Sequence, residues 1–400
     1  MSDFDEPIPV VVIDPGSGVF KAGRAGEEFP QHCFQTVVGV HKTFDESVIM
    51  KRKKKEIGKI LSARDGTEAE NGYAEQYVVG EKALEQRAEL ELSYPVERGN
   101  VQDWEQMEYI YEHVFLDLLE VEPEETFVLL TETPFTSRKS RETTAELLFE
   151  VFGIAALHIM QQPVLSLYAS GRTTGLVIDS GDAVTHAVPV YDGYPLNHSI
   201  ERLNLGGRDV TNNLQRILLE RGVNLSTTSE HHFAREVKEE LGYVSLNFDD
   251  DADWSSPESK FEKKFRLPDG QFITIGKELF RCTEIMFNPQ LVGSEALGLH
   301  DMAFRAWESC EVDVRNGLYN NIVLSGGNTL FTNFKERITR DLCGKTNSYR
   351  PFRVYSDSLR QFSSWIGGSV MASMGTFEKY AVSFDEYQDH GSSIIHNRRM

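Results

Sequence analysis

Short apolar runs of strand character alternate along this chain with segments whose apolar residues recur at helical spacing. The apolar runs predict strands at 10–13, 19–25, 126–130, 155–160, 175–178, 185–191 and 321–324. Helical spacing predicts helices at 104–119, 137–152, 210–221 and 230–241, and an acidic loop is expected at 247–258. Strands that alternate with helices indicate an α/β fold.

Two of the apolar runs end in an acidic turn that contains glycine. Residues 10–13 lead into Asp14-Pro15-Gly16-Ser17-Gly18, and residues 175–178 lead into Asp179-Ser180-Gly181-Asp182-Ala183. A second strand-like run follows each turn, so both segments are predicted to be tight hairpins. One such hairpin is usually only a turn. Two of them in matching contexts, far apart in the sequence, predict two related lobes that face each other.

The residue types in these turns suit a metal ion and a chain of phosphates. Carboxylates at strand ends, such as Asp14 and Asp179, supply hard oxygens for Mg²⁺ or its waters. Glycines lack Cβ atoms, so backbone N–H groups at Gly18 and Gly181, next to Asp182, can close on phosphate oxygens. We therefore expect the two hairpins to clamp a metal–triphosphate between them.

Four polar residues in or around the two hairpins could act on a bound phosphate or on water. Ser17 can donate its hydroxyl to a terminal phosphate, and Lys21 has the reach to offset phosphate charge. Gln162 follows a predicted strand, where an amide can orient water without being a strong base. His186, just past the second hairpin, could polarise that water, although a lone histidine is more often structural. A metabolic kinase would need a carboxylate base, so Gln162 favours slow hydrolysis and a nucleotide-dependent switch.

Other polar positions could contact a nucleoside. The run 325–327 is Ser-Gly-Gly at a strand end, which suits close approach of a nucleotide to the backbone. Arg235, Lys238 and Glu239 lie on a polar predicted helix. They could border a ribose and base or could simply be solvated, and their spacing alone favours the solvated interpretation.

Composition limits the class of protein. A chain of 400 residues is long enough for two lobes or more. Its 41 Lys and Arg against 62 Asp and Glu give a net charge of −21, which opposes general affinity for nucleic acid or anionic membranes. Four cysteines without CxxC spacing indicate reduced thiols in an intracellular protein. Residues 1–9 are acidic, unlike a secretory signal, and 153–171 is expected to be a buried strand and helix, not a membrane span.

Residues 43–76 differ in texture from the rest of the chain. They contain the basic run Lys51-Arg52-Lys53-Lys54-Lys55 and then a stretch rich in Asp, Glu and Gly, with little apolar periodicity. This composition predicts a mobile surface insertion. The basic run could be a nuclear signal or a patch for an anionic partner, but a solvated loop on an acidic protein is the favoured interpretation.

Taken together, these residues resemble the actin family over nearly the whole chain. The resemblance rests on the runs 14–23, 129–132, 164–175 (VLSLYASGRTTG), 179–182, 184–186, 267–270, 324–327 and 365–369. Within that family, several stretches are similar to centractin, the actin-related filament subunit of dynactin. They are 11–14, 33–34, 185–190 (THAVPV), 198–200, 207–210, 321–327 and 329–331.

The resemblance implies an actin-like fold of two lobes and four subdomains, with ATP or ADP and Mg²⁺, or alternatively Ca²⁺, in a central cleft. By resemblance, subdomain 1 covers 1–35, 95–169 and 363–400, subdomain 2 covers 36–94, subdomain 3 covers 170–205 and 295–362, and subdomain 4 covers 206–294. The resemblance places Asp14 and Asp179 at the metal and Gln162 and His186 at hydrolysis. It places the nucleotide on Ser17, Gly18, Lys21, Gly181, Asp182, Gly207, Arg235, Lys238, Glu239, Gly327 and Phe331.

Self-association is also implied by the resemblance. Actin-like subunits join head to tail in an open filament, and the apolar stretch 287–299 matches a segment that contacts neighbouring strands. Its Leu291, Val292 and Leu297 are expected to be exposed. Three positions depart from the family pattern near the nucleotide: Pro15 replaces Asn, Ala183 replaces Gly, and Gln361 replaces Lys, so nucleotide affinity and hydrolysis rate are in doubt.

The function expected from the sequence is that of a cytoplasmic, nucleotide-binding assembly subunit. It would form a short filament with itself or with other actin-family subunits. This filament would be the one in dynactin, which supports dynein-driven transport. One alternative is a nuclear actin-related subunit of a chromatin-remodelling complex, with 51–55 as import signal. Another is a divergent conventional actin that forms long filaments.

Overall fold

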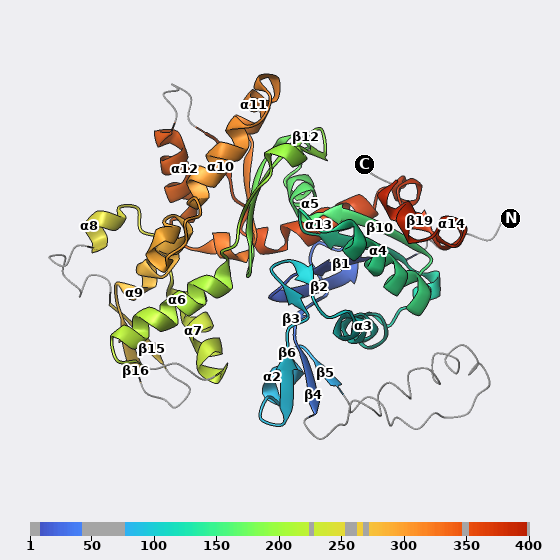
Figure 1. Cartoon of the computed structure of the whole chain (residues 1–400), viewed down its shortest axis with the longest axis horizontal. Helices are drawn as coiled ribbons and strands as arrows, with labels where there is room; N and C mark the ends of the chain where they lie inside the picture. Colours follow the sequence, from blue (N-terminus) through green and yellow to red (C-terminus); the bar gives the residue numbers. More distant parts are fainter. Residues whose placement is uncertain are drawn as a thin grey trace.

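The computed structural model describes residues 9–41, 77–223, 228–252, 262–266, 272–345 and 352–397. The predicted insertion 43–76, with its basic run, lies outside the described residues. Within them the chain has mixed α/β content, as expected, arranged around two large sheets (Figure 1). Cys33, Cys282, Cys310 and Cys343 are all thiols.

The first lobe is built on a six-stranded sheet of order β19-β10-β9-β1-β2-β3. Its strands are β1 (Val10–Pro15), β2 (Val19–Arg24), β3 (His32–Gln35), β9 (Phe127–Glu132), β10 (Ala156–Gln161) and β19 (Val382–Ser383). β1 and β2 form the first predicted hairpin, β9 runs parallel to β1, and β10 runs parallel to β9. The predicted helices α3 (Trp104–Glu112) and α4 (Arg138–Glu146) each continue as a π-helix, to Leu118 and Val151.

The second lobe repeats this plan. Its sheet has the order β13-β12-β11-β17-β18, with β14 also paired to β12. The strands are β11 (Gly175–Ser180), β12 (Thr185–Tyr191), β13 (Tyr194–Pro195), β14 (Glu201–Leu203), β17 (Ile322–Ser325) and β18 (Val354–Tyr355). β11 and β12 form the second predicted hairpin, and β17 and β18 continue the sheet in parallel. The expected relationship between two lobes is therefore present in the strand order.

Two helices, α5 (Gln162–Ala169) and α13 (Ser363–Ala372), lie between the sheets (Figure 1). They share one apolar cluster with Val12 of the first sheet and Val177 of the second. A Cβ at Gly367 would lie only 1.8 Å from the carbonyl oxygen of Leu165, so only glycine allows this helix contact. The stretch 153–171 is the predicted strand and helix, and among the described residues no helix is long and apolar enough to span a membrane.

The remaining elements extend both lobes outward. They are β4 (Val38–His41), β5 (Tyr77–Val79), α2 (Glu81–Glu85), β6 (Leu90–Ser93), β7 (Val96–Glu97), β8 (Asn100–Val101), α6 (Gly207–Glu220), α7 (Thr228–Leu241), α8 (Phe248–Ala252), β15 (Lys263–Arg266), β16 (Phe272–Ile275), α9 (Glu278–Arg281), α10 (Leu299–Glu308), α11 (Val312–Tyr319), α12 (Phe334–Gly344) and α14 (Phe384–His390). The boundaries of the four subdomains stay a prediction.

The expectation of a loop at 247–258 is wrong for its first part. Residues Phe248–Ala252 form α8, and 253–258 lie outside the described residues. Asp249, Asp250 and Asp251 occupy the first turn of this helix, where negative charge is stabilised by the helix dipole. The side chain of Asp251 also accepts a hydrogen bond from Ser245 at 2.7 Å.

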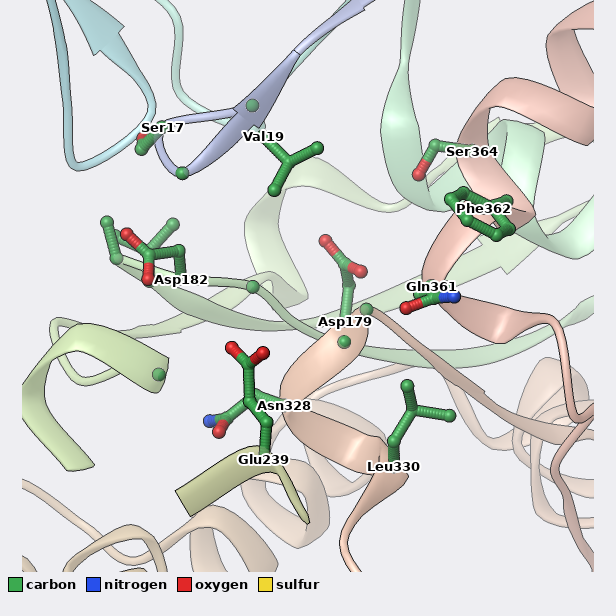
Figure 2. A pocket seen from close by; sticks show the side chains of 18 of the residues that line it. Ser17, Val19, Asp179, Asp182, Glu239, Asn328, Leu330, Gln361, Phe362 and Ser364 are labelled. Carbon is green, nitrogen blue, oxygen red and sulfur yellow. The ribbon is translucent and has the colours of Figure 1, made fainter. Parts of the chain in front are cut away.

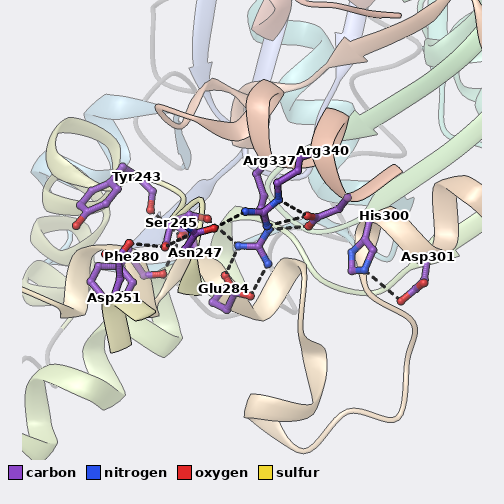
Figure 3. Close-up of polar contacts among 12 residues, drawn as sticks. Tyr243, Ser245, Asn247, Asp251, Phe280, Glu284, His300, Asp301, Arg337 and Arg340 are labelled. Carbon is purple, nitrogen blue, oxygen red and sulfur yellow. Dashed lines mark hydrogen bonds and ion pairs between the residues drawn. The ribbon is translucent and has the colours of Figure 1, made fainter. Parts of the chain in front are cut away.

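A buried ionic network anchors α12 in the second lobe (Figure 3). Arg337 donates to both carboxylate oxygens of Glu284, at 2.9 and 3.0 Å, and to Asp341 at 2.6 Å. A further bond of 2.7 Å reaches the carbonyl oxygen of Ser245, and the guanidinium lies 4.6 Å from the ring centre of Phe287. α12 is thereby tied to the segment that precedes α8 and to the start of the apolar stretch 287–299.

Candidate functional site

A cavity of about 400 Å³ opens between the lobes, and both acidic hairpins line it (Figure 2). Of the predicted site residues, His186 alone is not part of its lining. The lining includes Asp14, Ser17, Gly18, Lys21, Gln162, Asp179, Gly181, Asp182, Gly207, Arg235, Lys238, Glu239, Gly327 and Phe331. Ser17 and Asp182 lie at one end of the view, and Gln361 and Leu330 lie at the other.

Asp14, near the end of β1, is held by three neighbours. Lys21 Nζ lies 2.7 Å from its Oδ2, Gln162 Nε2 donates to its Oδ1 at 2.7 Å, and the Thr131 hydroxyl donates to the same oxygen. Burial by itself raises the pKa of a carboxyl group, but the Lys21 ammonium and these hydrogen bonds outweigh it and hold the pKa of Asp14 below its usual value. Asp14 is therefore a carboxylate with a fixed orientation.

Asp179 occupies the equivalent place in the second hairpin. It pairs with His186 across the hairpin and with Ser325 in the parallel strand β17. Burial raises the pKa of Asp179, and the negative charge of Asp14 adds to this effect, while Ser325 and Lys21 oppose it. A cation such as Mg²⁺, bound by both carboxylates, would relieve the electrostatic repulsion between Asp14 and Asp179.

The turns of the two hairpins touch. A Cβ at Gly18 would lie 2.6 Å from the Cβ of Asp182, closer than two carbon atoms can approach. In the first turn, the Ser17 hydroxyl accepts a hydrogen bond from the N–H of Gly99 at 2.9 Å. The glycine thus permits the approach of the two lobes at this end of the cavity.

Two arginines cross between the lobes in opposite directions at the same end. Arg208, on α6, donates to the carbonyl oxygen of Ser17 at 3.3 Å and to Asp182 at 3.2 Å. Arg98, in the turn between β7 and β8, donates to the carbonyl oxygen of Ala183 at 3.2 Å. Each hairpin therefore accepts a hydrogen bond from an arginine that belongs to the other lobe.

α7 borders the cavity beside the second hairpin. Lys238 is buried and donates to the carbonyl oxygen of Gly207 at 3.0 Å, and burial lowers its pKa. Arg235 donates to Glu239 at 2.8 Å on the same helix. A Cβ at Gly242 would lie 3.0 Å from the ring of Phe331. Arg235, Lys238 and Glu239, for which the sequence favoured simple solvation, therefore line the cavity.

Several features of this lining fit a phosphorylated ligand with a divalent ion. A Cβ at Gly327 would meet no atom within 4 Å, so the backbone there is open to a ligand. The Oδ1 of Asn328, which lines the cavity, is buried without a hydrogen-bond partner among the described residues. No group of three or more His, Cys, Asp or Glu among these residues is placed to hold a metal alone. A cation here would therefore be coordinated by Asp14, Asp179 and phosphate oxygens of the ligand, a set of ligands that is usual for Mg²⁺.

His186 lies behind the cavity wall. It is buried in β12, its Nε2 has no hydrogen-bond partner among the described residues, and its ring centre is 6.5 Å from that of Phe135. Burial, and then the charge of Arg202, lowers the pKa of His186 to about 3. The ring is therefore neutral at physiological pH.

Some lining residues were not singled out from the sequence as contacts to a ligand. They are Val19, Gly99, Thr133, Val184, Glu240, Gly242, Asn328, Leu330, Thr332, Phe362 and Ser364. They come from loops, helix ends and, for Val19, the start of β2, so their position at the cavity depends on tertiary contacts. The three departures Pro15, Ala183 and Gln361 also line the cavity.

The sequence profile of the Actin family matches residues 5–400, nearly the whole chain. Proteins of this family are cytoskeletal or related subunits, and they generally bind an adenine nucleotide with a divalent cation. The paired hairpins, the repeated sheet plan and this match agree with one another. The chain is a member of the actin family.

Proposed function

We propose that this chain binds ATP or ADP with Mg²⁺, or alternatively Ca²⁺, in the cavity between the two hairpins. Asp14 and Asp179 would hold the cation, which would neutralise phosphate charge. Ser17, Gly18, Lys21, Gly181 and Asp182 would contact the phosphates. The nucleoside would lie against Gly207, Arg235, Lys238, Glu239, Gly327 and Phe331.

The observation that carries this proposal is the contact between the two hairpin turns at one end of a single cavity. Each turn is preceded in its strand by a carboxylate that lines the same space. Gln162 already donates to Asp14, so its amide would orient a water molecule from a fixed position. We infer a slow hydrolysis coupled to conformation, with His186 as a neutral neighbour of the site.

We further propose that the nucleotide-bound chain assembles head to tail with itself or with other actin-family subunits. Leu291, Val292 and Leu297 are exposed to 43, 38 and 39%, and an apolar segment of this kind suits an interface. The resemblance to centractin supports a short filament in the cytoplasm, as part of dynactin and of dynein-driven transport. The nuclear alternative is supported only by residues 51–55, which lie outside the described residues.

Three experiments test these proposals separately. Purified full-length chain should retain ATP or ADP and gain heat stability when either is added with Mg²⁺; a folded protein that does neither contradicts nucleotide binding. Mild affinity purification with mass spectrometry should recover dynein and dynactin subunits. Recovery of remodelling ATPases would support the nuclear alternative, and long filaments in electron micrographs with ATP and Mg²⁺ would support a conventional actin.

A further inference from the structure

The side chain of Thr131 lies just behind the cavity wall. Thr131 is near the end of β9, which runs between β1, the strand that carries Asp14, and β10, the strand that leads into Gln162. The residue is 1% exposed and is not part of the cavity lining. Thr131 therefore acts on the cavity only through the side chains that it contacts.

Thr131, Asp14 and Gln162 meet in one group of hydrogen bonds. The Thr131 hydroxyl and Gln162 Nε2 both donate to Asp14 Oδ1, the amide at 2.7 Å. Gln162 Nε2 also makes a longer contact of 3.4 Å to Thr131 Oγ1. The three residues are at most 8% exposed, so water competes little for these bonds and each donor must face an acceptor.

The number of protons fixes the orientation of the Gln162 amide. A threonine hydroxyl has one proton, and a carboxylate only accepts. Because Thr131 gives its proton to Asp14, its oxygen can only accept from Gln162. Both atoms at this end of the amide are therefore acceptors, which suits the two protons of Nε2 and would repel the amide oxygen. Gln162 lines the cavity, and Oε1 is the atom that its side chain has left for a water molecule there.

We propose that Thr131 is a positioning residue for ATP hydrolysis, because it holds the Gln162 amide with Oε1 as an acceptor for the attacking water. A water that donates to Oε1 keeps a lone pair for the γ-phosphorus. In the reaction, the water oxygen bonds to that phosphorus, and the bridging P–O bond breaks with its electron pair on ADP. The proton that water loses goes to the released phosphate or to solvent. The inference rests on the proposed nucleotide site and its slow hydrolysis.

The alternative is that Thr131 only helps to hold Asp14. In that case, its loss would weaken the binding of ATP with Mg²⁺, and the effect would not depend on Gln162. A role through Gln162 predicts instead that the hydrolysis rate falls while the affinity is kept, since Asp14 still has Lys21 Nζ at 2.7 Å. It also predicts that Thr131 has no effect once the amide is gone.

The test measures phosphate release in a single turnover by the purified chain saturated with ATP and Mg²⁺, and nucleotide affinity by titration with a fluorescent ATP analogue. We expect Thr131→Val to slow hydrolysis about tenfold with unchanged affinity, and Thr131→Ser to restore the rate. Thr126→Val is the matched control, because Thr126 is also buried, directly before β9, and donates to the Glu122 carbonyl oxygen at 2.6 Å. It should leave the rate unchanged.

A double variant separates the two roles. Thr131→Val combined with Gln162→Ala should hydrolyse ATP no more slowly than Gln162→Ala alone. Two effects that multiply, or a loss of affinity that accounts for the slower rate, would overturn the inference. Thr131→Ala replaces Thr131→Val if the latter does not fold, and a folded variant with the wild-type rate overturns the inference while ATP binding stands. A wild-type chain that binds ATP and releases no phosphate overturns the proposed hydrolysis as well.

Discussion

Gly18 in the first hairpin lies directly against Asp182 in the second, with no space for even a methyl group between them. This contact joins the two lobes at the end of the cavity lined by Ser17 and Asp182. The two residues are far apart in the sequence, and neither is unusual in its own turn. Their contact makes the absence of a side chain at position 18 a condition for the closed site.

Gly18→Ala should therefore separate the hairpins. Because the new Cβ would overlap Asp182, we expect a loss of roughly 1–3 kcal/mol in stability and about a tenfold loss of ATP affinity. Thermal midpoints with and without ATP measure both. Gly375→Ala is the control, since its Cβ would meet no atom within 4 Å. Equal behaviour of the two variants would contradict the contact.

Arg208→Ala should accelerate nucleotide release. Arg208 bonds Ser17 in the other lobe and Asp182 in its own lobe. Because it is partly exposed, we discount its contribution to about 1 kcal/mol, or roughly a fivefold faster release. Stopped-flow release of a fluorescent ATP analogue measures the rate. Arg24→Ala, which removes a hydrogen bond within the first lobe, should leave it unchanged. A faster release in both variants would argue against a specific latch.

The lowered pKa of His186 predicts that the free energy of unfolding decreases in acid. Its pKa is about 3 in the folded chain, below the ordinary value of 6.5 that it regains on unfolding, so the unfolded chain binds more protons between these values. Stability should fall as pH decreases from about 6.5, by up to about 1.4 kcal/mol per pH unit from this residue. His186→Gln should flatten the dependence of the thermal midpoint on pH as the solution is acidified from neutrality. His390→Gln, at an exposed position, should leave this pH dependence unchanged. If His186→Gln also leaves it unchanged, His186 is not its source.

The stability of the chain should depend strongly on the buried pair of Arg337 and Glu284 that anchors α12. Arg337→Met leaves Glu284 buried without its partner and should destabilise the chain by about 3–5 kcal/mol. The double variant Arg337→Met with Glu284→Leu should recover much of this loss, because it removes the carboxylate that the single variant leaves unpaired. Denaturant unfolding of the single and double variants measures the difference. A double variant less stable than Arg337→Met would contradict this explanation.

Substitutions in the exposed apolar stretch 287–299 should impair assembly without affecting folding. Leu291→Ser with Val292→Ser should abolish sedimentable assemblies in ATP and Mg²⁺ while leaving the thermal midpoint nearly unchanged, since surface substitutions usually alter stability by at most about 0.5 kcal/mol. Leu219→Ser, on the exposed face of α6, is the matched control. Normal assembly of the double variant would exclude this segment from the interface.

Local pattern was enough to predict most of the framework. Both hairpins, the π-extended helices α3 and α4 and the strands that precede Gln162 and Gly327 follow from apolar periodicity and turn residues, which act over a few neighbouring positions. The failure at α8 is of the same local kind: an acidic run looks like a loop until its charges are placed at a helix N-terminus.

Contacts between distant segments could not be predicted in this way. That Arg235, Lys238 and Glu239 face the cavity, that His186 is buried behind it, and that Gln162 meets both Asp14 and Thr131 depend on how the two sheets pack against α5 and α13. The residue types and turns are encoded in short stretches of the chain, whereas the distances between them arise only when the lobes close on a shared apolar layer. For this protein, sequence determined the chemical groups available to the site, and folding determined which of them meet.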